Sequence, residues 1–204
     1  MNKVPSVPEL QFDEVRHFYS LNGIKIPSVT EIMRPLTKSH YGEINLDILN
    51  AAAKRGKEVH QAIENFFAFG IDDVPPEHEG YYLAFKDWLN KSNPEIIAAE
   101  SRISHKTLRY AGTSDLACIM HDKMVCVDFK TSTQIVDMLT RVQLEAYSRA
   151  FESHGFKFDE KAIVLLHKNG KWSTKTYASS DSEAWEVFGS LLLIHNYLAK
   201  NGGK

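Results

Sequence analysis

Two carboxylates and a lysine lie close together on two short, mostly apolar segments in the middle of the chain. Asp115 falls within Ala111–Met120, whereas Asp128 and Lys130 fall within Met124–Thr131. A polar turn separates the segments, so we expect a β-hairpin. Side chains alternate along a strand, so Asp128 and Lys130 project to the same face. The alternative is a solvated hairpin with these charges in water.

The apolar run before Asp128, Met124–Val127, favours a buried strand over a solvated one. Buried charges are costly unless they are paired or bound to a metal. Carboxylate oxygens suit Mg²⁺ or Mn²⁺. The pattern therefore predicts a site that holds a divalent cation and polarises a water. Lys130 would orient that water and stabilise charge that builds on a phosphate.

A helix is predicted over Ala51–Phe69, and it carries a second set of candidate residues. Gly56, His60 and Glu64 follow one another at intervals of four and share one stripe of that helix. Glycine costs about 1 kcal/mol relative to alanine there, which a close approach to another backbone could offset. His60 would bind the metal as a neutral imidazole, and Glu64 would orient His60 or a metal-bound water. Alternatively, His60 and Glu64 simply hydrogen-bond each other at a helix edge.

A further helix is predicted over Ile135–Phe151. Gln143 and Tyr147 share one face of it and can reach a phosphate or a base edge. The alternative is an ordinary surface glutamine and a half-buried tyrosine.

The order of these motifs resembles the RecB-type branch of the PD-(D/E)XK nucleases. The resemblance spans residues 27–150. The segment Pro27–Ile32 is also similar to one in mitochondrial genome-maintenance exonucleases and phage-encoded exonucleases, although Ser28–Glu31 alone indicates a capping box at a helix start. The motifs that carry the resemblance are G-x-x-x-H-x-x-x-E (Gly56, His60, Glu64), G-x-x-D (Gly112, Asp115), D-x-K (Asp128, Lys130) and Q-x-x-x-Y (Gln143, Tyr147).

The resemblance implies a role for each matching residue. One or two Mg²⁺ or Mn²⁺ ions would be held by three side chains and one backbone carbonyl: His60, Asp115, Asp128 and Phe129. Lys130 would contact the attacking water. Three further residues would support the site from outside the ligand set: Glu64, Gln143 and Tyr147. Glu100, on the preceding predicted strand, would either lie near the site or form a surface salt bridge.

The implied activity is hydrolysis of DNA without a covalent enzyme intermediate. We expect an exonuclease that acts on single-stranded ends, with a replication or recombination protein as a further partner. Two alternatives stay open: a structure- or sequence-specific endonuclease, and a nucleic-acid-binding module that has lost the chemistry. The implied fold is α/β, with a restriction-endonuclease-like mixed central sheet flanked by helices.

Composition sets further bounds. The 204 residues suffice for one domain, and a net charge of −2 counts against a broadly basic surface. Two cysteines, Cys118 and Cys126, are too few for a four-cysteine iron–sulfur cluster, so we expect none and interpret both as core thiols, with a cross-strand disulfide as the less favoured alternative. Neither a signal peptide nor a membrane span is predicted, which suggests the cytoplasm, or the host cytoplasm for a phage protein.

We predict a single domain over residues 1–204, with residues 1–14 as an extended arm. Aromatic residues on the helix Gly80–Lys91 pack in the core or stack on unpaired bases. The other predicted elements are a hairpin at Val15–Pro27, helices at Ser28–Pro35 and Leu46–Gly70, three strands between Glu95 and Thr131, a helix at Ile135–His154, strands at Lys161–His167 and Lys171–Tyr177, and a helix at Ser182–Lys200.

Overall fold

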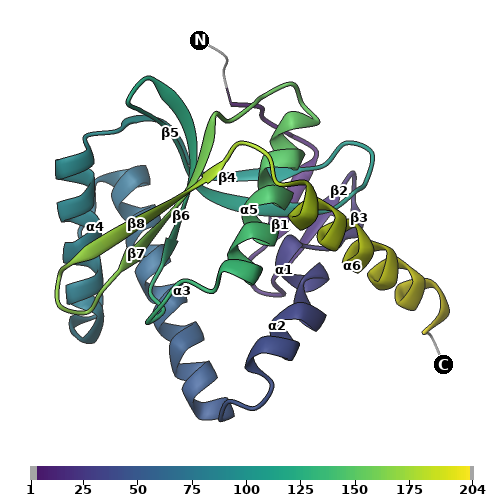
Figure 1. The fold of residues 1–204 in the computed structure, drawn as a ribbon, viewed down its shortest axis with the longest axis horizontal. Coiled ribbons are helices and arrows are strands. Elements are labelled where there is room, and N and C mark those ends of the chain that lie inside the picture. Colours follow the sequence, from purple (N-terminus) through teal and green to yellow (C-terminus); the bar gives the residue numbers. More distant parts are fainter. Residues whose placement is uncertain (1–3, 203–204) are drawn as a thin grey trace.

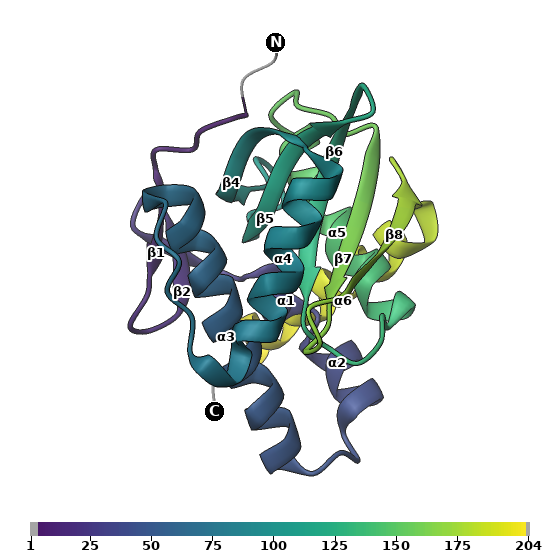
Figure 2. The same ribbon diagram turned by 90° about the vertical axis from the view of Figure 1, so that its left-hand side faces the viewer.

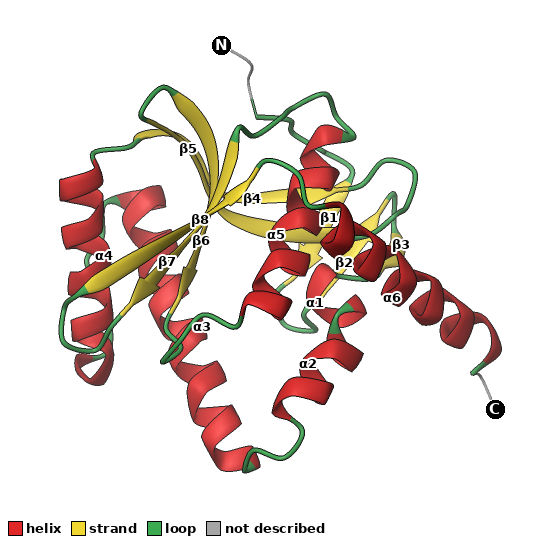
Figure 3. Ribbon diagram, viewed as in Figure 1, coloured by secondary structure: helices red, strands yellow, loops and turns green. Residues whose placement is uncertain are grey.

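The computed structural model describes residues 4–202 and has a central five-stranded sheet with helices on both faces (Figure 1, Figure 3). The strand order is β4-β5-β6-β7-β8; only β6 and β7 are parallel, so the sheet is mixed. This confirms the predicted α/β class with a mixed sheet flanked by helices. The elements of this layer are α3 (Leu46–Phe69), α4 (Glu79–Ser92), β4 (Glu95–Ser104), β5 (Ala111–Met120), β6 (Lys123–Lys130), α5 (Asp137–Glu152), β7 (Glu160–Leu166), β8 (Trp172–Ala178) and α6 (Ser182–Asn201).

A second, three-stranded antiparallel sheet precedes this layer. It consists of β1 (Leu10–Asp13), β2 (Phe18–Leu21) and β3 (Ile24–Ile26). The β2–β3 hairpin turns at Asn22-Gly23, as predicted, with both residues at positive φ (53° and 73°). Within the segment predicted as an extended arm, residues 1–14, the strand β1 pairs with β2, a pairing that the sequence did not indicate; Met1–Lys3 lie outside the described residues.

Two short helices connect the small sheet to α3. Ser28 caps α1 (Val29–Ile32), since its hydroxyl accepts the Glu31 N–H at 3.0 Å, as the capping box predicts. The chain then re-enters a helix, α2 (Arg34–Tyr41), where the sequence indicated none. Pro35 lies at the first turn of α2, where its missing N–H costs nothing. The single helix predicted at Ser28–Pro35 is therefore two helices, and the second continues past Pro35 to Tyr41.

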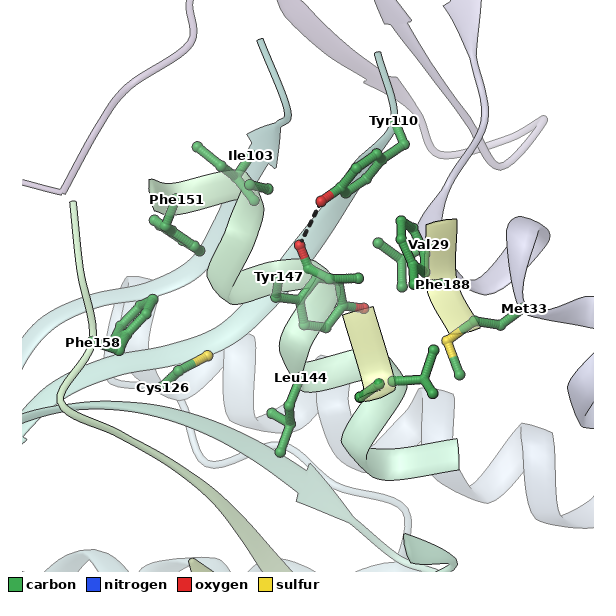
Figure 4. Packing of buried hydrophobic residues seen from close by; sticks show 14 of the residues in the cluster. Val29, Met33, Ile103, Tyr110, Cys126, Leu144, Tyr147, Phe151, Phe158 and Phe188 are labelled. Carbon is green, nitrogen blue, oxygen red and sulfur yellow. Dashed lines mark hydrogen bonds between the residues drawn. The ribbon is translucent and has the colours of Figure 1, made fainter. Parts of the chain in front are cut away.

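Apolar residues fill both sides of the sheet, because its inner strands are covered by helices on each face (Figure 2). One core packs α3 and α4 against the sheet, and Tyr82, Phe85 and Trp88 lie buried in it. These aromatic residues of α4 therefore pack in the core and do not stack on bases. The other core lies under α5 and α6 (Figure 4), where the Tyr110 hydroxyl donates to the Ala146 carbonyl at 2.9 Å.

The two cysteines are free, buried thiols, which confirms the core interpretation and not the disulfide. Cys118 belongs to the core beneath α3 and α4, whereas Cys126 belongs to the core beneath α5 and α6. They face opposite sides of the sheet and cannot bond to each other without a change of register. Burial raises the pKa of each thiol to about 12, so neither is a reactive thiolate at neutral pH.

A buried ion pair fixes α5 on the sheet. Glu145 of α5 pairs with Lys161 of β7, and both side chains are about 1% exposed. Arg149 adds a second contact to Glu145 at 2.8 Å, and Glu145 also accepts the backbone N–H of Asp181, which caps α6, at 3.1 Å. A buried charge pair demands good geometry, so this network sets the position of α5.

Among residues 4–202, no helix has the length and apolar character that a membrane crossing requires.

The start of α4 depends on one glycine. A Cβ built on Gly80 would lie 1.8 Å from the carbonyl oxygen of Lys168, in the turn between β7 and β8. Backbone cannot yield there cheaply, so we predict that Gly80→Ala lowers the free energy of unfolding by about 1–3 kcal/mol. Urea denaturation of dilute protein measures this change.

Gly189→Ala in α6 is the matched control. A Cβ there meets nothing within 4 Å, so this variant should be stabilised by up to about 1 kcal/mol through helix propensity. Equal effects of both substitutions would contradict the assigned contact.

Candidate active site

The candidate site lies where β5 and β6 separate. The hairpin turns at His121-Asp122, as predicted, and its register ends at Leu116 opposite Val127. Beyond that point the Asp115 side chain replaces the backbone pairing, because its Oδ2 accepts the backbone N–H of Phe129 at 2.7 Å. A side chain thus satisfies a backbone donor that the partner strand would otherwise have paired. The separation leaves room for side chains between the two strand ends.

His60 reaches this point from α3. Its Nε2 lies 2.9 Å from the Phe129 carbonyl oxygen, and its Nδ1 lies 3.5 Å from Asp115 Oδ2. His60 therefore lies beside Asp115 and Phe129 in the folded chain, although α3 is far from β5 in sequence. The chain gives His60 two oxygen neighbours, an arrangement that suits either a protonated imidazole or a shared cation.

Glu100 of β4 completes the cluster. One ligand atom each from His60, Glu100 and Asp115 can be chosen such that all three lie within 4.8 Å of one another. Glu100 has φ 47°, a left-handed conformation that is rare for a non-glycine residue in a strand. Its Oε1 is buried without a hydrogen-bond partner. The surface salt bridge considered for Glu100 is therefore not what the structure shows.

On the α5 side, a polar chain runs from Asp128 into the helix. Lys130 Nζ lies 2.8 Å from Asp128 Oδ2 and donates to Gln143 Oε1 at 2.9 Å; Gln143 in turn donates to the Tyr147 hydroxyl at 3.2 Å. Lys130 and Asp128 therefore form an ion pair. The predicted shared face of Asp128 and Lys130 is confirmed.

Gly112 explains how Tyr147 enters the site. A Cβ at Gly112 would lie 2.4 Å from the Tyr147 ring, so only glycine lets the ring lie flat against β5. The glycine of the G-x-x-D motif is thus a packing requirement of α5 against β5. Tyr147 is buried, and burial, followed by the charge of Asp128, raises its pKa well above the ordinary value.

The other predicted glycine has a different environment. A Cβ at Gly56 would meet only Thr131 Oγ1, at 3.9 Å, which is ordinary contact. The expected close approach of α3 to another backbone is therefore wrong. Glu64 also differs from expectation: its carboxylate accepts from Gln61 at 3.1 Å rather than from His60, and it lines the cleft beside Glu100.

Electrostatics in the site reflect crowded carboxylates. Burial opposes the charging of His60, but the Asp115 carboxylate outweighs it and raises the pKa of His60 to about 9. Burial and the Asp115 charge raise the pKa of Glu100 to about 8. Burial alone would raise the pKa of Asp115, yet His60 and Lys130 hold it below its usual value. Burial raises the pKa of Asp128, and Lys130 offsets part of that rise.

The donor set fits a divalent cation. The buried Glu100 Oε1 has no hydrogen-bond partner, and an orphaned buried oxygen calls for a missing donor or ion. The buried Asp128 Oδ2 has Lys130 as its ion-pair partner at 2.8 Å. Carboxylates, one imidazole and a backbone carbonyl are ligands for Mg²⁺ or Mn²⁺. His60, Glu100 and Asp115 would hold the ion, with Asp128 and the Phe129 carbonyl beside them; Glu100 is the member that the motifs left undecided.

A cleft of about 390 Å³ opens onto this cluster. Its walls come from the small sheet, α1, α3, β4 and β5. Three basic side chains line it, His17, Lys57 and Arg102, and the acidic Glu14 lies beside them and pairs with Arg102 at 3.3 Å. A second cavity, of about 240 Å³, reaches Lys130 from the α2 side, and a third, of about 300 Å³, lies between α3 and the residues that follow β6.

No protein-family model and no curated protein matches this sequence. Several solved structures, among them the following three, are similar to this chain. SSO0001 is 13% identical, with a TM-score of 0.42, over 82% of this chain and 74% of that one. An alkaline exonuclease, LHK-Exo, from Laribacter hongkongensis is 10% identical, with a TM-score of 0.41, over 72% and 84%. LHK-Exo in complex with dAMP is 12% identical, with a TM-score of 0.43, over 86% and 87%. Likeness this distant carries no argument about activity, which must come from the geometry of the site itself.

The raised pKa values of His60 and Glu100 make stability dependent on pH. Both groups bind protons more tightly when folded: the pKa of His60 rises from 6.5 to about 9, and that of Glu100 from 4.5 to about 8. Stability from each is present below its unfolded pKa and is lost as pH rises through its folded pKa. We predict that the Tm of metal-free protein in EDTA falls between pH 6.5 and pH 9.

Glu100→Gln separates the two contributions. The variant lacks the carboxylate that resists ionisation, so its Tm should fall less over the same pH range. Added Mn²⁺ should stabilise the wild type more at pH 9 than at pH 6.5, because protons compete with the ion for the same ligands. A Tm that is flat or rising with pH in EDTA would contradict this account.

Proposed function

We propose that this chain is a divalent-metal-dependent nuclease that hydrolyses DNA, and specifically an exonuclease that acts on single-stranded ends. The observation that carries the proposal is the unpartnered buried oxygen of Glu100 beside His60 and Asp115, together with the neighbouring Asp128–Lys130 ion pair. Such a set is costly without a cation, and it lies at the floor of a cleft rather than in a closed core.

The bound ion would neutralise the phosphodiester, lower the pKa of a water and stabilise the leaving oxygen. The chain's own residues supply the rest. Lys130 keeps its proton, because the Asp128 and Asp115 charges outweigh burial and raise its pKa. Its ammonium therefore acts as a donor that orients the attacking water and stabilises charge on the phosphate. Gln143 holds Lys130 in place, and Tyr147 holds Gln143.

The enclosure of Lys130 supports action on strand ends. The cavities that meet at Lys130 and His60 measure about 240–390 Å³, at or below the lower end of the range for pockets that hold a small ligand. They suit a strand taken one or two nucleotides at a time rather than a rigid duplex. Residues of the small sheet line the main cleft, and residues of α2 line the cavity at Lys130, so a strand would enter by its end.

Basic residues along this path support a nucleic-acid substrate. Lys57 and Arg102 line the main cleft, and Arg55 lines the cavity beside Thr131, where its guanidinium lies over the Tyr81 ring at 5.5 Å. Local positive charge binds phosphates even when the whole chain is slightly acidic.

Cleavage of end-labelled single-stranded DNA tests the proposal. With Mn²⁺, we expect linear DNA to be degraded, circular DNA of the same sequence to be resistant, and EDTA to abolish the reaction. Lys130→Ala should lower the rate at least about a hundredfold, as loss of one transition-state donor does. The matched control is Lys123→Ala at the other end of β6, where the lysine pairs with Glu160 on the surface.

Each part of the proposal can fail separately. Rapid cutting of circular DNA would make the protein an endonuclease. Full activity in Lys130→Ala would place the chemistry elsewhere. Absence of cleavage in protein that binds Mn²⁺ and DNA would leave a binding module.

Gly56 gives a test of the substrate path. Alanine there would add about 1 kcal/mol of helix stability, and no protein atom opposes it within 3.9 Å. Gly56 lines the cavity that also contains Arg55 and Lys130, so a methyl group would narrow the path of a DNA strand. We predict that Gly56→Ala raises Tm but raises the KM for single-stranded DNA several-fold.

Asn50→Ala is the control, since it raises helix propensity at an exposed position of the same helix that does not line these cavities. It should raise Tm and leave KM unchanged. An unchanged KM in Gly56→Ala would show that the strand does not pass this glycine.

A further inference from the structure

The second half of α6 carries apolar side chains that nothing in the described chain covers. The helix packs against the body through Ala184, Phe188 and Leu192, and no residue after Leu192 is buried. The helix then leads away from the sheet toward the C-terminus (Figure 1). Leu193 is 71% exposed and Tyr197 is 66% exposed. Neighbouring large apolar residues exposed to this degree mark an interaction surface.

Helical periodicity places this surface opposite the core. At 100° per residue, Leu193 lies about 100° from Leu192 and on the far side from Ala184. The stripe through Leu193 therefore points away from the body along the whole length of α6. A partner helix lying on this stripe would meet no part of the same molecule's sheet.

The residues of this stripe lie at equal spacings on the two sides of Leu193. Tyr197 lies four residues after Leu193 and Gly189 four before it; Lys200 lies seven after and Glu186 seven before. All four side chains or backbone positions are exposed. In an antiparallel pair of identical helices related by a two-fold axis at Leu193, each residue faces its counterpart at the same distance on the other side of the centre.

This order is complementary in charge and in shape. Glu186 of one copy would face Lys200 of the other, twice by symmetry, at the two ends of the contact. The Tyr197 ring would lie over Gly189, where a Cβ would meet nothing within 4 Å. Leu193 would meet its own symmetry mate at the centre. A parallel pair would instead place Glu186 against Glu186 and Lys200 against Lys200.

We propose that α6 forms a two-fold, antiparallel contact with α6 of a second copy of this chain. The other exposed apolar side chains of α6, Val187, Ile194 and Leu198, lie about 100–140° around the helix from Leu193 and so outside this contact. A contact between single helices is small, so the dimer belongs to the class of weak, concentration-dependent assemblies. This inference is independent of the nuclease proposal.

Sedimentation equilibrium of the full chain, at concentrations from about 1 to 100 μM, tests the contact, because weak interfaces dissociate in that range. We expect a monomer–dimer equilibrium in the wild type. Leu193→Asp should weaken it at least about tenfold, as loss of a central interface residue does. Leu83→Asp on α4, another exposed leucine on a helix, is the control and should leave the equilibrium unchanged.

Charge reversal distinguishes the antiparallel contact from non-specific association. Glu186→Lys and Lys200→Glu should each weaken the dimer, because each places like charges opposite one another at both ends. The double variant should restore the wild-type affinity. A monomer at all concentrations, or a dimer that Leu193→Asp leaves intact or that the double variant fails to restore, would overturn the proposal.

Discussion

The hydrogen bond from the Phe129 N–H to Asp115 is the contact on which the site depends. It satisfies the backbone at the point where β6 leaves β5, so the strands can separate without an orphaned donor. Phe129 and Lys130 meanwhile stay paired with β7. One strand is thus held by its other neighbour while a gap opens on the first side. His60 reaches that gap from α3, and Lys130 reaches it from β6.

The gap brings several carboxylates close together, and their like charges are unfavourable for one another. Burial and the charge of Asp115 raise the pKa values of Glu100 and Asp128, while His60 opposes the rise in both and Lys130 opposes it in Asp128. The left-handed backbone of Glu100 adds conformational strain at the same place. Unfavourable features that cluster in one cleft, rather than being scattered, are typical of a site selected for function over stability.

The sequence predicted the residues that lie on regular elements better than those placed by irregular backbone. Strand alternation was enough to pair Asp128 with Lys130, and helical spacing was enough to pair Gln143 with Tyr147. Glu100 remained undecided, because its approach to Asp115 depends on the register of β4 and on one left-handed residue. Its one signal was the resemblance, which implies that a glutamate on this strand can lie near the site. The strand β1 and the helix α2 were missed, because short elements are formed by tertiary pairing more than by local propensity.

The Glu145–Lys161 pair links substitutions near the site to substitutions at the start of α6. Replacing either member alone would leave an uncompensated charge in the core, whereas an apolar pair of similar volume can be neutral or stabilising. A substitution of Glu145 or Lys161 is therefore expected to need a compensating substitution of the other. Because Glu145 also accepts the backbone N–H that begins α6, and Gln143 and Tyr147 lie on the same helix as Glu145, drift at the start of α6 is constrained by the geometry around Lys130. The crossover helix and the C-terminal helix are thus expected to be inherited as one unit.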